Sequence, residues 1–310
     1  MVCCMIFLLL VSSQIFLPNK STRGRHEFIA LKSQIVNSVK GQRLLIISGS
    51  NSVYGISCKT IHDKTGFLCA NGGTIVTFGV DYILHNARTW AKPGDTVLLP
   101  LEYLHYQDNG IPNQQLIEYV LAYDMNYLKR IDPVTQFSMI GGISFWKLIN
   151  NIVSVIQEKK SKNKNNSIQK SNIKKINKYG DTTSNQKKLD IVDTFQPLKI
   201  TGNVTDTNGM KSIAKFIKWC RENNINVLAT WPNTIYFEEY NTKATEKYFD
   251  SIKEFYKNLK VPMIGEPQDF MYNKSLFYDS MYHLNAKGVT QRTQQLIDLL
   301  EPYLNKIKSY

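Results

Sequence analysis

The stretch "RLLIISGS", residues 43–50, decides the fold, because it runs from four apolar residues directly into small polar ones. A short run that is apolar on both faces is typical of a strand in a parallel sheet that is covered on both sides. Residues 26–40 before it carry apolar side chains at helical spacing, and residues 52–64 after it are expected to form another helix. A buried strand between two helices predicts an α/β fold.

The same alternation continues along the chain, and each further strand is short and apolar. We expect the second and third strands at residues 67–73 and 96–103, with a helix between them. After a long interruption, residues 104–200, the fourth and fifth strands are expected at residues 225–231 and 261–264, each followed by a helix. This order predicts a doubly wound, flavodoxin-like three-layer sandwich of about five parallel strands, with a long insertion between strands three and four.

The net charge of +13 comes mostly from one segment of this insertion. Residues 159–188 contain ten lysines and one acid, Asp181, which leaves about +4 for the rest of the chain. Because this Lys/Asn/Ser-rich run has few apolar residues, we expect residues 157–190 to be disordered. Contact with an anionic polymer or a membrane surface is the alternative. No zinc-finger or RNA-binding motif accompanies the charge, so nucleic acid is not an expected partner.

The N-terminal segment is apolar and nearly uncharged over residues 2–17, and three basic residues follow it. Its length suits a signal-peptide core or a short membrane anchor better than a full span of about 20 residues. We interpret residues 1–25 as a signal anchor or export signal through which the chain meets the membrane. Residues 26–310 then form the α/β domain, outside the cytoplasm in the periplasm or cell envelope. A buried core helix is the alternative interpretation.

Metal and nucleotide cofactors are not expected. None of the five cysteines forms a CxxC pair, so a zinc site is unsupported. Cys58 and Cys69 would pair in an oxidising compartment, although unpaired core residues are the favoured interpretation. No GxGxxG or GxxxxGK motif occurs, which excludes the usual dinucleotide and phosphate-binding loops.

The loops that follow the strands of a doubly wound sheet gather at one edge, where ligands bind. In this chain those loops contain Ser50, Asn51, Asn71, Gly72, Glu102, Tyr103 and Asn233. A serine nucleophile needs a base within hydrogen-bond reach, usually a histidine that a carboxylate orients. Of the five histidines, His283 is the best candidate, since Asp279 lies four positions before it in one loop.

Four stretches in this order resemble the SGNH (GDSL-like) hydrolase superfamily, and most closely its envelope- and polysaccharide-associated branch. The resemblance covers residues 44–103 and 212–300. The stretches are "SGSNSVYGI" (48–56), "NGG" (71–73), "KPGDTVLLPLEY" (92–103) and "FYDSMYHLNAKG" (277–288). The combination in this order is far more specific than any one stretch.

The resemblance implies a role for each member of a catalytic triad. Ser50 would be the nucleophile, and its own backbone N–H would be one oxyanion donor. His283 would be the general base, and Asp279 would orient it. Ser52 is the second candidate for the nucleophile; its alternative role is to cap the following helix.

The resemblance also implies an oxyanion hole, and here the sequence departs from the family. Gly72 would supply a backbone N–H and Asn71 its side-chain amide, or Asn71 would simply form the turn. Family members usually carry an asparagine donor after strand three, where this chain has Glu102 and Tyr103. The amides of Asn51, Asn71 and Asn233 or the hydroxyl of Tyr103 would have to substitute for it. Glu102 would bind a sugar hydroxyl or pair with a positive residue.

The resemblance implies a serine esterase or O-acyltransferase that acts on O-acyl groups, chiefly acetyl groups, of an envelope polysaccharide. The missing asparagine leaves a second interpretation open. In that interpretation the chain is a catalytically degenerate, carbohydrate-binding accessory protein that works with a membrane acyltransferase.

Overall fold

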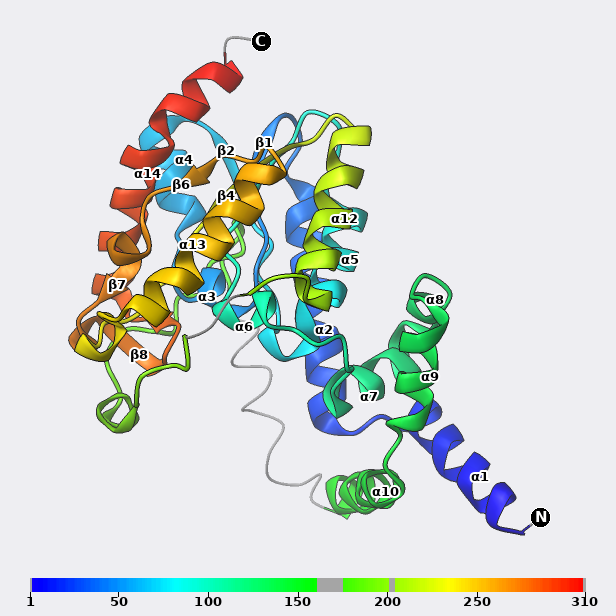
Figure 1. Cartoon of the computed structure of the whole chain (residues 1–310). Helices are drawn as coiled ribbons and strands as arrows, with labels where there is room; N and C mark the ends of the chain where they lie inside the picture. Colours follow the sequence, from blue (N-terminus) through cyan, green and yellow to red (C-terminus); the bar gives the residue numbers. More distant parts are fainter. Residues whose placement is uncertain (1, 161–174, 201–203, 309–310) are drawn as a thin grey trace. The chain divides into compact units, whose positions relative to one another are not determined.

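The computed structural model describes residues 2–160, 175–200 and 204–308 (Figure 1). The chain divides into two compact units. The helical unit consists of residues 1–31, 77–79 and 110–174, and the sheet unit of residues 32–76, 80–109 and 175–310. Helix α2 (Lys20–Ser38) contributes to both units.

The sheet unit is built on five parallel strands in the order β2-β1-β3-β4-β6. The strands are β1 (Arg43–Ile46), β2 (Leu68–Asn71), β3 (Thr96–Leu99), β4 (Asn226–Thr230) and β6 (Met263–Ile264). Every residue of β1 and β3 is buried, as expected for apolar strands covered on both faces. The prediction of an α/β fold with about five parallel strands is confirmed.

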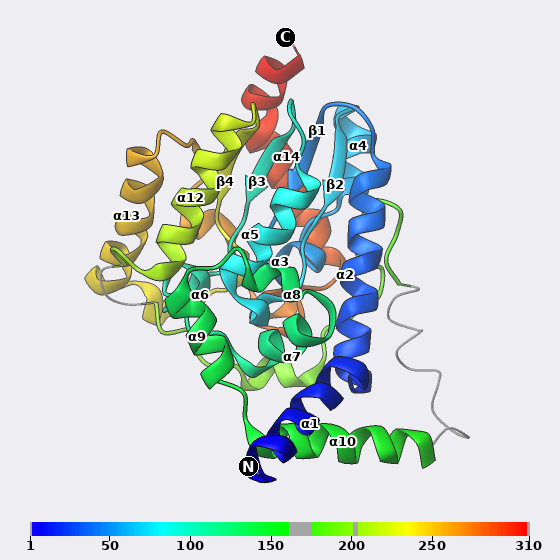
Figure 2. The same cartoon turned by 90° about the vertical axis from the view of Figure 1, so that its right-hand side faces the viewer.

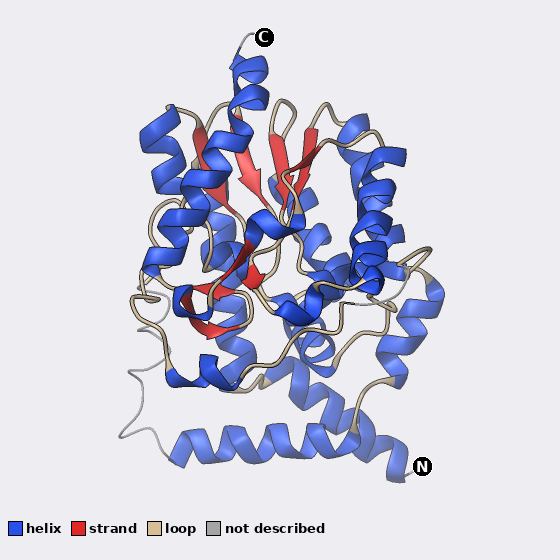
Figure 3. Cartoon of the chain, turned by 60° about the vertical axis from the view of Figure 1, so that its left-hand side comes forward, coloured by secondary structure: helices blue, strands red, loops and turns tan. Residues whose placement is uncertain are grey.

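Helices cover both faces of the sheet (Figure 3). On one face, α4 (Cys58–Thr65) packs against α14 (Ala286–Lys308), and the Ser57 amide donates to the Thr293 hydroxyl at 3.0 Å. On the other, α5 (Gly79–Trp90) and α12 (Asn208–Glu222) lie side by side (Figure 2), joined by a 2.8 Å hydrogen bond from Ser212 to Asp81. Helix α13 (Lys243–Asn258) connects β4 to β6.

Short elements follow the carboxyl ends of the strands. They are the helices α3 (Ser50–Val53) and α6 (Tyr103–Tyr106), and the paired strands β5 (Thr234–Ile235) with β7 (Met271–Tyr272) and β8 (Phe277–Ser280) with β9 (His283–Leu284). Single 3₁₀ turns complete them at Val76–Phe78, Asp190–Thr194, Glu238–Tyr240, Pro267–Phe270 and Lys274–Leu276. The predicted gathering of loops at this edge is therefore what the topology produces.

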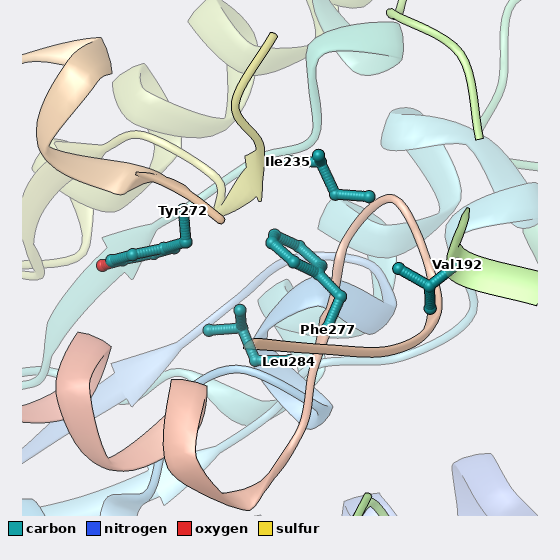
Figure 4. Close-up of a cluster of buried hydrophobic side chains, with 5 residues drawn as sticks. All are labelled: Val192, Ile235, Tyr272, Phe277 and Leu284. Atoms are coloured by element: carbon teal, nitrogen blue, oxygen red, sulfur yellow. The ribbon is translucent and has the colours of Figure 1, made fainter. Parts of the chain in front are cut away.

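A small hydrophobic cluster supports the β8–β9 hairpin (Figure 4). The hairpin contributes Phe277 and Leu284, both fully buried. Val192, Ile235 and Tyr272 from three other segments close around them. The hairpin therefore has an apolar core of its own, which fixes it without a place in the main sheet.

The insertion is divided differently from the prediction. Residues 104–109 and 175–200 lie within the predicted insertion but belong to the sheet unit. Of the segment predicted to be disordered, residues 161–174 lie outside the described residues. Residues 175–190 are ordered, against the prediction: the buried carboxylate of Asp181 accepts hydrogen bonds from the amides of Cys58 and Lys59 at 2.9 and 3.0 Å.

The helical unit contains α1 (Val2–Phe16), α7 (Gln114–Tyr123), α8 (Met125–Leu128), α9 (Pro133–Gly141) and α10 (Phe145–Lys160). Helix α1 packs against α7 and α10. His26 of α2 stacks on Tyr123 at 3.9 Å between ring centroids. Among the described residues, no helix has both the length and the apolar character that a membrane crossing requires.

A disulfide joins Cys58 at the start of α4 to Cys69 in β2, with 5.1 Å between the two Cα atoms. The favoured prediction that these residues are unpaired is wrong, because the helix and the strand bring them together across only eleven positions of the chain. Cys220 is buried with a free thiol.

Candidate active site

Three side chains that are far apart in the sequence form a hydrogen-bonded chain at the carboxyl edge of the sheet. The Oγ atom of Ser50 lies 2.8 Å from Nε2 of His283. The other ring nitrogen of His283, Nδ1, lies 2.6 Å from Oδ1 of Asp279. Both distances are within hydrogen-bond range, so the imidazole bridges the hydroxyl and the carboxylate. The structure thus brings together the three residues that the sequence predicted as a triad.

The position of Ser50 follows from a tight turn at the end of β1. Gly49 lies between the end of β1 and the start of α3, where Glu102 and Val76 pack closely against its Cα atom. A Cβ atom at Gly49 would lie 2.5 Å from Oε1 of Glu102 and 2.7 Å from the Cα of Val76. Only glycine fits there, and the chain can therefore place Ser50 at the first position of α3, where its side chain is partly exposed.

The β8–β9 hairpin accounts for the contact between Asp279 and His283. Ser280 and His283 pair across the hairpin, and Phe277 pairs with Leu284. Because this turn is so short, the carboxylate on one strand reaches the imidazole on the other. The Nδ2 group of Asn233 donates to the carbonyl of Tyr282 at 2.7 Å and fixes the tip of the turn.

Tyr54 packs against the imidazole of His283, and it was not among the predicted site residues. Its ring stacks on that of His283 with 4.1 Å between centroids and 17° between planes. Its carbonyl accepts the Leu284 amide at 3.1 Å. Burial raises the pKa of Tyr54, with a further contribution from the nearby Asp279 charge. The signal was available, since Tyr54 follows Ser50 by one helical turn.

Glu102 holds the backbone on both sides of Ser50. One carboxylate oxygen accepts the Gly49 amide at 3.0 Å, and the other accepts the Asn51 amide at 2.9 Å. Nε2 of His105 lies 3.2 Å from the carboxylate, and both side chains are fully buried. The prediction that Glu102 binds a sugar hydroxyl is therefore wrong; it is a buried partner of the nucleophile turn.

The charge of Glu102 is held in place by these contacts. Burial by itself would raise the pKa of the carboxyl group. The contact with His105 and the hydrogen bond from Asn51 outweigh that effect, so the pKa of Glu102 lies below its ordinary value. The carboxylate is ionised and accepts both amides, as a neutral acid could not do equally well.

Gly72 and Asn71 are occupied elsewhere and do not form the predicted oxyanion hole. The Gly72 amide donates to the carbonyl of Ile46 at 2.8 Å. The Asn71 amide group donates to the carbonyls of Ser52 and Ile56 at 2.8 and 3.1 Å. Asn71 instead supports the turn, its second predicted role, because its Oδ1 accepts the Gly73 amide at 3.1 Å.

Asn51 and Asn233, the other predicted amide donors, bind the buried side chain of Arg292, which was not among the predicted site residues. Arg292 is fully buried, and its Nη1 donates to Oδ1 of Asn51 at 3.1 Å and to Oδ1 of Asn233. The Asn51 amide group donates to the carbonyl of Pro100 at 2.6 Å. Burial lowers the pKa of Arg292 to about 10, which leaves it charged at neutral pH. Neither asparagine amide is available as an oxyanion donor.

Tyr103 and Ser52 are also enclosed. The Tyr103 hydroxyl is buried and has no hydrogen-bond partner among the described residues, so it is a packing residue here. Ser52 is fully buried, and its Oγ accepts from the Ser48 hydroxyl at 2.5 Å. Ser52 therefore lacks the exposure that a nucleophile requires, and Ser50 is the better candidate.

One oxyanion donor remains from the predicted set. Ser50 is the first residue of α3, and within the described part of the chain its amide has no hydrogen-bond acceptor. The first amides of a helix have no acceptor within the helix and can bond to a ligand instead. The Ser50 amide is therefore the donor best placed for a developing oxyanion beside its own side chain.

The described residues contain no cluster of side chains that could hold a metal ion. A hollow of about 460 Å³ lies at the opposite edge of the sheet, where Thr96 begins β3 and Asn226 begins β4, and it contains no triad residue. No family model matches the chain, and searches of the curated proteins and of the solved structures also give no match.

Proposed function

We propose that this chain is an SGNH-type serine esterase or O-acyltransferase that acts on O-acyl groups, chiefly acetyl groups, of an envelope polysaccharide. The observation that carries the proposal is the hydrogen-bonded chain from Ser50 through His283 to Asp279, with 2.8 and 2.6 Å between the bonded atoms. Those residues, in that order of contact, are what nucleophilic acyl transfer requires. The choice of an acylated polysaccharide rests on the sequence resemblance.

In this proposal Ser50 Oγ attacks the acyl carbon, and Nε2 of His283 takes its proton. Asp279 keeps the other ring nitrogen protonated and stabilises the imidazolium. His283 then protonates the departing sugar oxygen, which leaves an acyl group on Ser50. The same base activates the acceptor in the second half: water gives an esterase, and a sugar hydroxyl gives an acyltransferase.

The disulfide supports a location outside the cytoplasm. Disulfides such as Cys58–Cys69 persist in oxidising compartments and are rare in the cytosol. We therefore propose that the chain is exported, or anchored by its N-terminal segment, in the periplasm or cell envelope. A membrane acyltransferase that supplies or receives the acyl group is the partner that this location and the acyl chemistry suggest.

The second candidate is an accessory protein of the same acylation system with little activity of its own. The observation that favours it is the use of Gly72, Asn71, Asn51 and Asn233 inside the fold. Loss of one oxyanion donor costs about 2.7–4 kcal/mol of transition-state stabilisation. A site that retains the Ser50 amide as its donor would be a slow catalyst.

A fluorophosphonate serine probe separates the two candidates. We expect the wild-type chain to be labelled, Ser50→Ala and His283→Ala to lose labelling, and Ser52→Ala to retain it. Circular dichroism of each variant checks that the fold is intact. A wild-type chain that stays unlabelled would favour the accessory role, and labelling that survives Ser50→Ala would move the nucleophile. Release of acetate from an O-acetylated polysaccharide, with and without a sugar acceptor, then distinguishes hydrolysis from transfer.

A further inference from the structure

Exposed apolar side chains are concentrated in the helical unit. The described residues include seventeen exposed large apolar side chains, and thirteen of them belong to this unit. Soluble surfaces expose such residues singly, and a concentration of them marks a site of interaction. Their distribution over α9 and α10 shows what kind of site it is.

Helix α9 points its apolar stripe outward. Val134, Phe137 and Ile140 lie three residues apart and are 75%, 78% and 60% exposed. The opposite side of the helix is the one that packs, since Met139 is buried and Gly142 meets Ile117 of α7. Asp132 caps α9 by accepting the amides at its first turn, so the helix is well formed. Its exposed stripe is therefore a built feature of the unit.

Helix α10 is apolar on both sides. Its inner side buries Leu148 and Val155, and its outer side exposes four large residues. Trp146 is the most exposed of them at 72%, and Phe145 packs against it edge to face. We call the outer residues of both helices the apolar face: Val134, Phe137, Ile140, Phe145, Trp146, Val153 and Ile156.

We propose that the apolar face binds the surface of a lipid bilayer with anionic headgroups. Amphipathic helices that insert an apolar stripe with Trp or Phe, and that carry basic residues beside it, bind membranes in this way. Lys129 and Arg130 are exposed just before α9. Two acids lie close by: Asp132 is engaged as the cap of α9, and Glu158 of α10 pairs with Arg23. Lys129 and Arg130 thus complement an anionic lipid surface.

Helix α1 extends the apolar surface. It has no charged residue over its fifteen positions, it packs against α10, and it exposes Leu9 and Phe16. Two adjacent helices with outward apolar residues suit a bilayer, which accepts apolar groups over a wide area. This inference goes beyond the proposed function and does not depend on the chemistry at Ser50.

Fluorescence quenching of the full chain bound to vesicles tests the proposal. The vesicles contain phosphatidylethanolamine and phosphatidylglycerol with brominated acyl chains, which quench tryptophans at the membrane. We expect quenching of the wild-type emission, and loss of that quenching in Trp146→Phe, because the other three tryptophans, Trp90, Trp219 and Trp231, all belong to the sheet unit. If Trp146→Phe is quenched as strongly as the wild type, α10 does not meet the lipid and the proposal is overturned.

A matched pair of variants tests α9. Phe137→Asp should lower the vesicle partition constant roughly tenfold or more. The variant loses a phenyl ring that inserts into the bilayer, and it gains a negative charge. Ile191→Asp replaces an exposed apolar residue of the sheet unit and should leave the constant unchanged. Helix α1 is the same in both variants, so its contribution cancels in the ratio.

Two results would contradict the proposal. Equal vesicle binding by Phe137→Asp and Ile191→Asp would show that α9 makes no contact with lipid. Self-association in solution without vesicles, abolished by Phe137→Asp, would assign the apolar face to a second copy of the chain. Fluorophosphonate labelling of Ser50 in the same samples should be unchanged, which keeps this test separate from the proposed function.

Discussion

The Oε1 atom of Glu102 lies 2.9 Å from the backbone nitrogen of Asn51, and this hydrogen bond fixes the turn that presents Ser50. The second oxygen of the same carboxylate holds Gly49 on the other side at 3.0 Å. The residue between them keeps its own amide free of an acceptor among the described residues. Glu102 is thus a positioning residue for the candidate nucleophile.

Glu102→Gln should slow the labelling of Ser50 by the fluorophosphonate probe. The decrease should be larger than the loss of fold stability alone accounts for. The new amide group would face a backbone N–H, and an unsatisfied buried donor costs about 1–3 kcal/mol. We expect kcat to fall with KM little changed, because the turn moves and the substrate surface does not. Glu239→Gln, on an exposed 3₁₀ turn, is the matched control. Unchanged labelling kinetics in Glu102→Gln would remove the positioning role.

Tyr54→Ala should reduce the labelling rate of Ser50, and Tyr54→Phe should not. The ring lies 4.1 Å from that of His283, and aromatic pairs contribute about 0.5–1.5 kcal/mol beyond their buried area. A loss of that size corresponds to a reaction that is roughly twofold to twelvefold slower. The phenylalanine variant keeps the stacked wall and serves as the control. Equal rates for Tyr54→Phe and Tyr54→Ala would exclude stacking as the way the imidazole is held.

Lys32 is expected to make the stability of the fold depend on pH. Its ammonium group is fully buried and donates to the carbonyls of Asn71 and Gly180 at 2.9 and 2.5 Å. Burial lowers the pKa of Lys32 from 10.5 to about 7, with the Asp181 charge acting in the opposite direction. Above pH 7 the unfolded chain then binds a proton that the folded chain has released, so the free energy of unfolding rises with pH up to about 10.

Urea unfolding of the wild type and of Lys32→Met at pH 7, 8 and 9 measures this effect. The difference in unfolding free energy between the two should change in favour of the wild type by at most about 1.4 kcal/mol per pH unit. A neutral amine still has two N–H groups for the two carbonyls, so the hydrogen bonds survive deprotonation. A difference that stays constant from pH 7 to 9 would show that Lys32 remains charged.

Removal of the disulfide should destabilise the sheet unit by about 2–3 kcal/mol, the size expected for a short closed loop. Cys58→Ser combined with Cys69→Ser tests this, because the crosslink joins α4 directly to β2. Urea unfolding with and without reductant should then differ for the wild type and not for the double variant. Cys220→Ala, which removes the buried free thiol, should keep the sensitivity to reductant. A wild type that is insensitive to reductant would contradict the prediction.

The sheet was predictable from local pattern, and the triad from the resemblance carried by four stretches in their order along the chain. Leu44 and Leu45 of β1 are apolar on both faces, which is enough to predict a buried parallel strand. Asp279 and His283 lie in one loop, so their contact needs only a short hairpin. The choice of Ser50 over Ser52 came from the sequence resemblance, not from the strand end alone. These inferences need no knowledge of which distant residues meet.

The parts that were missed depend on long-range partners. Whether Asn51 is a donor to substrate or a structural group depends on Arg292, which lies 241 positions away. The Gly72 amide was expected to face substrate, but the register between β1 and β2 directs it to Ile46. Sequence shows which polar groups gather at an edge; it does not show which of them already have buried partners. The same limit applies to Cys58, whose partner depends on how α4 packs on β2.

Because a separate hydrophobic cluster supports the β8–β9 hairpin, the candidate nucleophile and the candidate base are held by different cores. Ser50 stands on the main sheet, whereas His283 stands on a core that includes Phe277 and Val192. A substitution in that core can shift the base while the strand that carries the serine keeps its place. Substitutions in the hairpin cluster can therefore change the reaction rate, whereas substitutions in the main sheet change the stability of the fold.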